Sequence, residues 1–170
     1  DSDYPELLKA IYDPPLLLFY LGDLTALSAP AVAVVGTRRC SEYGRKIAYD
    51  LARSLSDNKI TVTSGLARGI DTHVHRGALK GGSHQIAVLG SGLDIIYPPE
   101  NKSLAKAITG QGLILSEYLM GTDPVAGNFP KRNRIISGLS LGTIVVEANI
   151  KSGAMITAHT ALDQGREVMA

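Results

Sequence analysis

The sequence predicts an α/β domain in which a mostly parallel, doubly wound sheet carries helices on both faces. From residue 31 onward, short β-branched runs alternate with segments of helical length and period. These runs are almost continuously apolar, which is typical of strands buried on both faces of a parallel sheet. Together the two observations indicate an extended Rossmann-like fold, in which ligands bind at the carboxyl ends of the strands.

Six strands are expected, with helices between them. The strand candidates are residues 31–35, 59–64, 85–89, 113–117, 143–148 and 166–170, and the clearest helix candidates are 41–55, 100–108 and 156–165. Ser41 is expected to cap the first of these helices, and Gly165 to end the last. Apolar residues recur at spacings of four in helix 41–55, at Tyr43, Ile47, Leu51 and Leu55. Tyr43 is therefore expected to pack this helix on the sheet.

The composition favours one domain. With 170 residues, of which 45% are hydrophobic, the chain can bury one good core but not two of ordinary size. We expect residues 1–30 to form a lead-in helix and an edge strand packed on a main domain of residues 31–170. The longest apolar run, 16–21, is far shorter than the roughly 20 residues of a membrane helix. The single Cys40 and the lack of a signal-like opening segment favour a cytoplasmic protein without membrane contact.

The loops at the predicted strand ends do not match a cofactor enzyme. The loop GTRRCSEYG lacks the G-x-G-x-x-G fingerprint of dinucleotide sites. The next strand ends in Thr63, Ser64 and Gly65, where a carboxylate for a ribose hydroxyl would be expected. We therefore expect no cofactor. His73 and His75 are two residues apart on a helix and point to different faces, so no metal site is expected either.

Cations gather instead at four predicted helix entrances. These entrances are Gly36, Thr37, Arg38 and Arg39; Gly65, Arg68 and Gly69; Lys151, Ser152 and Gly153; and the stretch KRNR at 131–134. The net charge of +1 gives no general sign of a polyanionic partner, so the argument depends on where the cations lie. In the loop of Gly36, Thr37 and Arg38, free backbone N–H groups, a hydroxyl and a guanidinium are expected to converge on one anion. Each cation at a helix start costs about 0.3–1 kcal/mol, whereas a bound phosphate removes that repulsion. Four such loops at one sheet edge predict a groove for a polyanion.

Other reactive side chains fit this groove better than an active site. Cys40 has no identifiable base beside it and is interpreted as a small packed residue. The carboxylates near strand ends are interpreted as holding arginines in place: Asp71, Asp94, Glu117 and Glu147. Among them, Asp71 is expected to pair with Arg68. His75 and Arg76 are expected to border the groove, and Tyr118 is a weaker candidate than Phe129 for stacking on a base.

Several motifs resemble the DNA-processing protein A family, also called DprA or Smf. The resemblance lies in VAVVGTRRCSEYG, VTSGLARGIDTHVHRGAL, IAVLGSGLDIIYPPEN, LILSEY, FPKRNRIISGLS, TIVVEANIKSGAMITAHTALDQGREV and the lead-in YPELLKAIYDPPLLLFYLGDL. It therefore spans nearly the whole chain. Several of these motifs are long and unusual, so the resemblance is specific.

The resemblance implies a Rossmann-like protein that binds single-stranded DNA, dimerises, and helps to load the RecA recombinase on incoming strands during natural transformation. It implies binding without a reaction, so no enzyme activity is expected. The family's G-[ST]-R motif, which grips phosphate, falls on residues 36–38, its RNR motif falls on 132–134, and Phe129 matches an aromatic position suited to base stacking. With the loops above, the predicted nucleic-acid-binding residues are Gly36, Thr37, Arg38, Arg39, Gly65, Arg68, Phe129, Lys131, Arg132, Asn133, Arg134, Lys151, Ser152 and Gly153.

Two features depart from the family pattern. Family members commonly carry a basic residue a few positions before the FP pair, where this chain has PVAGNFP. The chain also ends at REVMA, before the residues that usually follow that strand. It lacks the small helical domain that often precedes this region and the winged-helix-like domain that often follows. We therefore expect a fragment of a longer protein.

The main alternative is a nucleotide-binding or nucleotide-hydrolysing enzyme of the related phosphoribohydrolase group, which resembles lysine decarboxylases. That group carries a PGGxGTxxE stretch with a catalytic glutamate, and the nearest glycine-rich stretch here, LGSGLDIIYPPEN, lacks that glutamate spacing. A small-ligand sensor that uses the same loops is a third hypothesis. Turnover of a nucleoside monophosphate would favour the enzyme, and saturable mononucleotide binding would favour the sensor.

Overall fold

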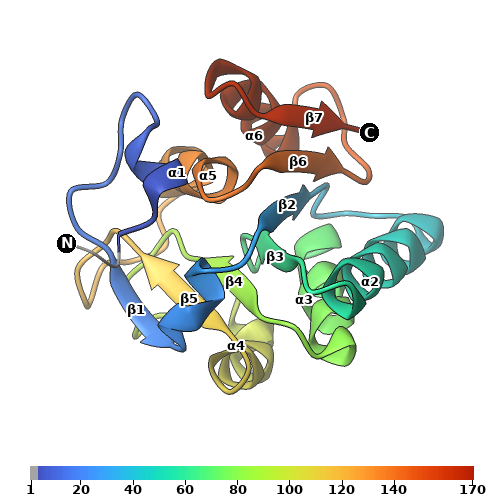
Figure 1. Ribbon diagram of the computed structural model, residues 1–170, viewed down its shortest axis with the longest axis horizontal. Coiled ribbons are helices and arrows are strands. Elements are labelled where there is room, and N and C mark those ends of the chain that lie inside the picture. The colour runs from blue at the N-terminus through green and yellow to red at the C-terminus, as the bar shows by residue number, and fades with distance from the viewer. Residues whose placement is uncertain (1–3) are drawn as a thin grey trace.

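A seven-stranded sheet forms the centre of the computed structural model, which describes residues 4–170 (Figure 1). The strands are β1 (Phe19–Gly22), β2 (Ala31–Val35), β3 (Thr61–Ser64), β4 (Gln85–Val88), β5 (Leu113–Ser116), β6 (Gly142–Val145) and β7 (Glu167–Met169). Their order across the sheet is β1-β5-β4-β3-β2-β6-β7. All neighbouring pairs are parallel except β1 and β5, so the predicted mostly parallel sheet is confirmed.

Helices cover both faces of this sheet. They are α1 (Glu6–Lys9), α2 (Glu42–Asp57), α3 (Ile70–Gly81), α4 (Lys102–Thr109), α5 (Asn128–Gly138) and α6 (Gly153–Asp163), with short 3-10 turns η1 (Leu24–Leu27) and η2 (Pro99–Asn101). Helices α1, α5 and α6 pack on one face, and α2, α3 and α4 pack on the other (Figure 1). This arrangement confirms the predicted doubly wound fold.

Strand β2 shows why the apolar runs are almost continuous. Ala33 and Val35 join the core cluster under α1, α5 and α6, whereas Val34 points to the opposite cluster under α2 and α3. Because alternate side chains enter different cores, both faces of the strand must be apolar.

The chain reverses its direction across the sheet beside β2. From β2 it moves through β3 and β4 to β5, and α5 then carries it back to β6 on the other side of β2. The loops that follow β2 and β6 therefore diverge at the carboxyl ends of two neighbouring strands. In doubly wound folds this switch point is where ligands bind.

Residues 4–30 lie along one end of the sheet and beneath α5. Strand β1 pairs with β5, with Phe19 opposite Ser116, and forms the antiparallel edge. Leu8 and Ile11 enter the same core cluster as Ile135 of α5. The expectation for residues 1–3 of the lead-in lies outside the described residues.

The predicted buried face of α2 is only partly confirmed: Leu51 and Leu55 pack against the core cluster under α2 and α3, but the expected packing of Tyr43 on the sheet was wrong. Tyr43 is 75% exposed, and the buried residues of this helix are Gly44, Ala48, Ala52 and Ser56. The reason is the close packing of α2 on α3, which leaves room only for small side chains. A Cβ atom at Gly77 of α3, for example, would overlap the carbonyl group of Tyr49.

Both predicted helix ends are confirmed. The Ser41 hydroxyl accepts the N–H of Gly44 at 2.9 Å and caps α2. Gly165 follows α6 with a φ of 69°, a left-handed conformation that glycine adopts without strain. Among residues 4–170, none of the helices is both long and apolar enough to span a membrane.

Candidate nucleic-acid interface

A cleft of about 670 Å³ lies at the switch point between β2 and β6. Its walls come from the loop after β2, the segment that joins β3 to α3, the loop after β4, the first turns of α5 with the loop before them, and the start of α6 with the loop before it. Nine of the predicted residues line this main cleft: Gly36, Thr37, Arg38, Arg39, Phe129, Arg132, Asn133, Ser152 and Gly153. These nine residues come from three segments that are far apart in the sequence, and the structure brings the segments together.

Aromatic rings and guanidinium groups stack at one end of the main cleft. The guanidinium carbon of Arg38 lies 5.1 Å from the ring centroid of Phe129, and the ring of Tyr97 lies 5.7 Å from the same ring. Arg68 lies 5.7 Å from the centroid of Tyr97. Such cation–π contacts stabilise the position of each cation by about 0.5–1 kcal/mol at exposed sites. A cation and a half-buried ring side by side are suited to a phosphate and a base, respectively.

Tyr97 was missed in the sequence. It follows β4 in the stretch LGSGLDIIYPPEN, which was compared with the glutamate spacing of an enzyme motif. Its position after a predicted strand could have identified it, because the loops at the carboxyl ends of parallel strands all lie at the same edge of the sheet.

A second cleft, of about 470 Å³, adjoins the main cleft on the side of α2 and α3. Arg38 and Arg39 line it together with Arg68, and α2 and α3 add Arg45 and Arg76. Arg76 borders the groove as predicted, whereas Arg45 was missed because it lies a full turn inside α2. We call this the arginine cleft.

The prediction that His75 borders the groove was wrong. His75 is completely buried, and its Nδ1 lies 2.7 Å from Oε1 of Gln85. Burial lowers the pKa of His75 from 6.5 to about 4, because the charged imidazole would lose its hydration. The histidine that lines the arginine cleft is His73.

The helix entrance after β2 is occupied by an internal carboxylate. Glu147 accepts the N–H of Ser41 at 3.1 Å and its hydroxyl at 2.8 Å, while its carbonyl oxygen accepts the N–H of Thr37 at 2.7 Å. The prediction of free N–H groups in this loop was therefore wrong for Thr37. Gly36 has a packing role, because a Cβ there would overlap the side chain of Ile70. The cations Arg38 and Arg39 remain exposed at the surface of the cleft.

The backbone N–H groups ahead of α3 also donate to an internal carboxylate. Asp71 accepts the N–H groups of Gly65 at 3.2 Å and Ala67 at 3.3 Å, and it is buried. Burial raises the pKa of Asp71, an effect that the nearby Arg132 and these N–H groups counteract. The expected pairing of Asp71 with Arg68 was wrong. Arg68 instead donates to both carboxylate oxygens of Glu100, at 2.5 and 3.1 Å.

The loops after β2 and β3 touch each other through Gly69. Its φ of 76° and its close approach to the backbone of Thr37 exclude a side chain at this position. The N–H of Ile70 donates to the carbonyl oxygen of Thr37 at 3.1 Å. Arg38 and Arg68 consequently lie on adjacent loops and both line the small pocket between the two clefts, together with Gly65.

The start of α6 is exposed at Lys151 and Gly153. Ser152 caps the helix by accepting the N–H of Met155 at 3.4 Å. Gly153 is exposed, and a Cβ there would have no atom within 4 Å. Lys151 is exposed but does not line either cleft.

The sequence suggested that the cations of KRNR lie ahead of a helix. In the structure they lie inside α5. The helix starts at Asn128 and is preceded by Gly127, so Lys131 belongs to its second turn. Lys131 is exposed and lies outside both clefts. The repulsion expected between these cations and the helix N-terminus is consequently weaker than predicted, because that effect is confined to the first turn.

Arg132 points into the protein and is only 3% exposed. Its Nη1 donates to the carbonyl oxygen of Gly65 at 2.8 Å and to that of Val88, and its Nε donates to Oδ1 of Asn133 at 3.2 Å. Burial lowers the pKa of Arg132 to about 10. The guanidinium thus ties α5 to the carboxyl ends of β3 and β4 at the floor of the main cleft.

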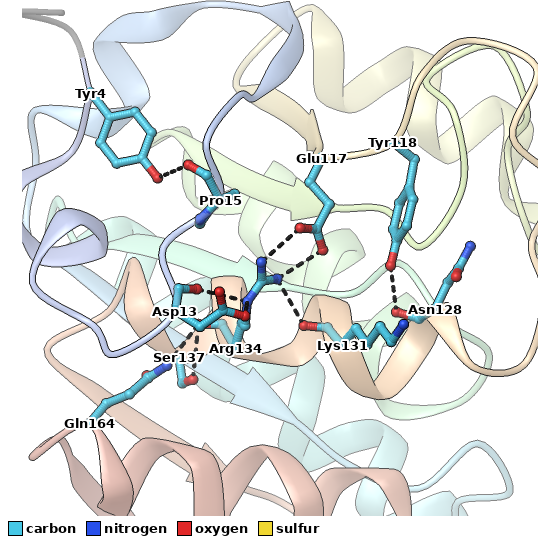
Figure 2. A network of polar contacts seen from close by, with 10 residues as sticks. All are labelled: Tyr4, Asp13, Pro15, Glu117, Tyr118, Asn128, Lys131, Arg134, Ser137 and Gln164. Carbon is cyan, nitrogen blue, oxygen red and sulfur yellow. Dashed lines mark hydrogen bonds and ion pairs between the residues drawn. The ribbon is translucent and has the colours of Figure 1, made fainter.

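Arg134 forms the centre of a separate polar network on the other side of α5 (Figure 2). It donates to both oxygens of Glu117 at 2.8 Å, and its Nε donates to the carbonyl oxygen of Asp13 at 2.9 Å. The Arg134 side chain is 18% exposed and that of Glu117 is 17% exposed. The hydrogen bonds that Arg134 donates to Glu117 raise the pKa of Arg134. Arg134 therefore fastens the N-terminal segment to α5, and the structure does not bring it to either cleft.

Asp94 and Tyr118 also have structural partners. Asp94 accepts the N–H of Gly121 at 3.0 Å, and the Tyr118 hydroxyl donates to the carbonyl oxygen of Asn128 at 3.3 Å. Cys40 is half-buried at the edge of the arginine cleft. Within residues 4–170, no three His, Cys, Asp or Glu side chains gather closely enough to hold a metal ion.

Comparison with known proteins gives a consistent match. The family model of DNA recombination-mediator protein A matches residues 1–170. The DNA processing protein DprA of Streptococcus pneumoniae is 49% identical over 170 residues, covering 100% of this chain and 60% of that protein. The chain spans about half the length of the curated relatives it matches. The resemblance inferred from the motifs is thereby confirmed.

Two solved structures show the same fold. The X-ray structure of DprA from Streptococcus pneumoniae superposes with a TM-score of 0.95 at 48% identity, covering 99% of this chain and 59% of that chain. The structure that describes the single-stranded DNA binding mode of DNA processing protein A from Helicobacter pylori gives a TM-score of 0.91 at 36% identity, covering 96% of this chain and 75% of that chain.

Proposed function

Because the chain belongs to the DNA recombination-mediator protein A family, we propose that it binds single-stranded DNA without sequence preference. In this proposal it acts as a homodimer in the cytoplasm, protects incoming strands and helps to load RecA during transformation and recombination. The similarity to a Helicobacter pylori protein described by its single-stranded DNA binding mode supports the DNA-binding step. The dimer and RecA come from the family resemblance.

The observation that carries the proposal is the stack of Arg38 on Phe129 at the switch point. Single-stranded DNA offers a phosphate backbone and bases whose faces are free to stack. Proteins without sequence preference bind it with cations beside aromatic rings. Arg38 and Arg39 make no ion pair within the described residues, so both are free to meet phosphates.

The geometry supports binding better than catalysis. Among residues 4–170, Asp71 is the one carboxylate that lines the main cleft, and it is buried and accepts two backbone N–H groups. Glu147 is held in the same way by Ser41. A general acid or base must reach its substrate and exchange a proton, which neither group can do without breaking these contacts. We therefore propose that the cleft has no enzymatic role.

The proposal can be tested with fluorescence-anisotropy titrations of labelled oligothymidines of graded length at two salt concentrations. We expect affinity to rise with length and to fall with salt, with a slope near −0.7 for each phosphate contact. Arg38→Gln is expected to weaken binding by about ten- to a hundredfold, because a charge-assisted hydrogen bond contributes about 1.5–3 kcal/mol. Arg53→Gln is the matched control, because Arg53 is an exposed arginine of α2 outside both clefts.

Three results would contradict DNA binding: no binding of any length at low salt, salt-independent binding, or equal behaviour of the two variants. Titration with nucleoside monophosphates in the same buffer tests the alternative. Saturable binding or turnover of a mononucleotide would favour the sensor or the phosphoribohydrolase-like enzyme. Sedimentation analysis and RecA-filament assays test the two partner proposals.

A further inference from the structure

The residues that line the arginine cleft carry an excess of positive charge. Within the part of the chain that the structure describes, five arginines line this cleft and Glu100 is the single carboxylate that does so. Arg38, Arg39 and Arg76 make no ion pair within residues 4–170. Surface charges of one sign repel each other, so the empty cleft is less favourable than a neutral one.

The two ion pairs beside the cleft do not neutralise it. Arg45 lies 3.9 Å from Glu42, and the side chains are 50% and 96% exposed, so this pair contributes little. Arg68 is engaged by Glu100, but it also lies over the ring of Tyr97 and faces the pocket that joins the clefts.

The pKa of His73 reflects the positive potential of this surface. This pKa is lowered mainly by partial burial, and in addition by the charges of Arg76 and Arg45, against a smaller opposing effect of Glu42. The cations on α2 and α3 therefore act on the same region of the cleft.

The arginine cleft is continuous with the main cleft. Arg38 lines both clefts and also the small pocket between them. That pocket holds the row of Phe129, Tyr97 and Arg68, in which each group lies within 6 Å of the next. A chain of phosphates and bases that occupies the main cleft thus meets a continuous surface of rings and cations leading to α2 and α3.

We propose that a single strand bound in the main cleft continues across Arg38 and Tyr97 into the arginine cleft, where Arg45 and Arg76 contact its phosphates. This inference rests on the proposed function, and it adds a second segment to the path of the strand. A single nucleotide would leave one cleft empty, whereas a polyanion neutralises both. The arginine cleft thereby makes the affinity depend on the length of the strand.

The test compares two double variants that remove the same charge from the same helices. Arg45→Gln/Arg76→Gln removes the cations of the arginine cleft. Arg53→Gln/Lys80→Gln removes exposed cations of α2 and α3 that line neither cleft. Glutamine is a good helix former, so both variants should keep the helices intact. Each is titrated by anisotropy with oligothymidines of about 4 and about 16 nucleotides, which bracket common site sizes.

We expect Arg45→Gln/Arg76→Gln to weaken binding of the longer oligonucleotide at least about tenfold and to reduce its salt slope by about 1.4, which is 0.7 for each lost contact. Its binding of the short oligonucleotide should stay within about twofold of wild type, which also shows that the variant is folded. The matched control should leave both lengths unchanged.

Equal losses at both lengths, or no loss at the longer one, would overturn the inference. An effect of the same size in the control variant would also overturn it, because net charge alone would then explain the result. If the wild-type protein binds neither length, the proposed function itself fails. If binding depends on Arg38 but not on Arg45 and Arg76, the proposed function stands and only the second segment fails.

Discussion

Replacing Arg132 should test whether this residue grips DNA or holds the floor of the cleft. Family resemblance assigns it to binding, whereas the structure gives its guanidinium internal partners. Arg132→Met removes the donor to the carbonyl oxygens of Gly65 and Val88 and the cation whose charge counteracts the burial of Asp71. The methionine is of similar length and leaves no large cavity.

The expected loss of stability follows from these contacts. Each buried carbonyl left without a donor costs about 1–3 kcal/mol. In addition, Asp71 loses the charge that counteracts its burial, and breaking a buried charge pair typically costs about 3–5 kcal/mol. These terms overlap, so we expect the free energy of unfolding to fall by about 3–5 kcal/mol. A domain of this size has about 5–15 kcal/mol in total, so the variant should remain folded at low temperature.

The assay is urea denaturation followed by circular dichroism, with Lys131→Met as the matched control. Lys131 is the preceding residue of the same helix and is exposed, so its replacement should change the unfolding free energy by less than about 0.5 kcal/mol. The structural account is refuted if Arg132→Met loses less than about 1 kcal/mol while oligothymidine binding disappears. That outcome would mean that the guanidinium turns outward to the strand.

Two further predictions concern stability away from the main cleft. Glu117→Gln should lower the unfolding free energy by about 1–3 kcal/mol, because the charge-assisted hydrogen bonds from Arg134 become weaker. Urea denaturation measures this loss, with the exposed Glu42→Gln as the control. For His75, the folded pKa of about 4 lies below the ordinary 6.5, so between these values only the unfolded state binds the proton and stability falls as the pH decreases. At about 1.4 kcal/mol per pKa unit, the free energy of unfolding should fall by about 3 kcal/mol. Urea denaturation at pH values from 7 to 4 measures this fall. It should be smaller in His75→Gln and unchanged in the exposed control His159→Gln. An unchanged pH profile in His75→Gln would contradict this account.

The structure explains why the candidate site was only partly predictable. The sequence located Arg38 and Phe129 because both lie beside helix starts at the carboxyl edge of the sheet, Arg38 in a loop and Phe129 in the first turn of α5. The same reasoning assigned free N–H groups to the loop of Thr37, where Glu147 supplies the acceptor instead. A helix N-terminus attracts an anion from solvent or from the protein itself, and local sequence does not distinguish the two. Glu147 lies 106 residues away from Ser41 along the chain.

The sequence by itself determined the layered α/β fold and the sheet edge at which the binding loops meet. Both follow from local patterns, because strands buried on two faces must be apolar throughout and parallel strands place their carboxyl ends together. Only the tertiary structure decided what each cation does. Arg132 and Arg134 are two residues apart on α5, yet one enters the core, and the other pairs with Glu117. A separation of two residues turns side chains to different sides of a helix, and packing then supplies their partners.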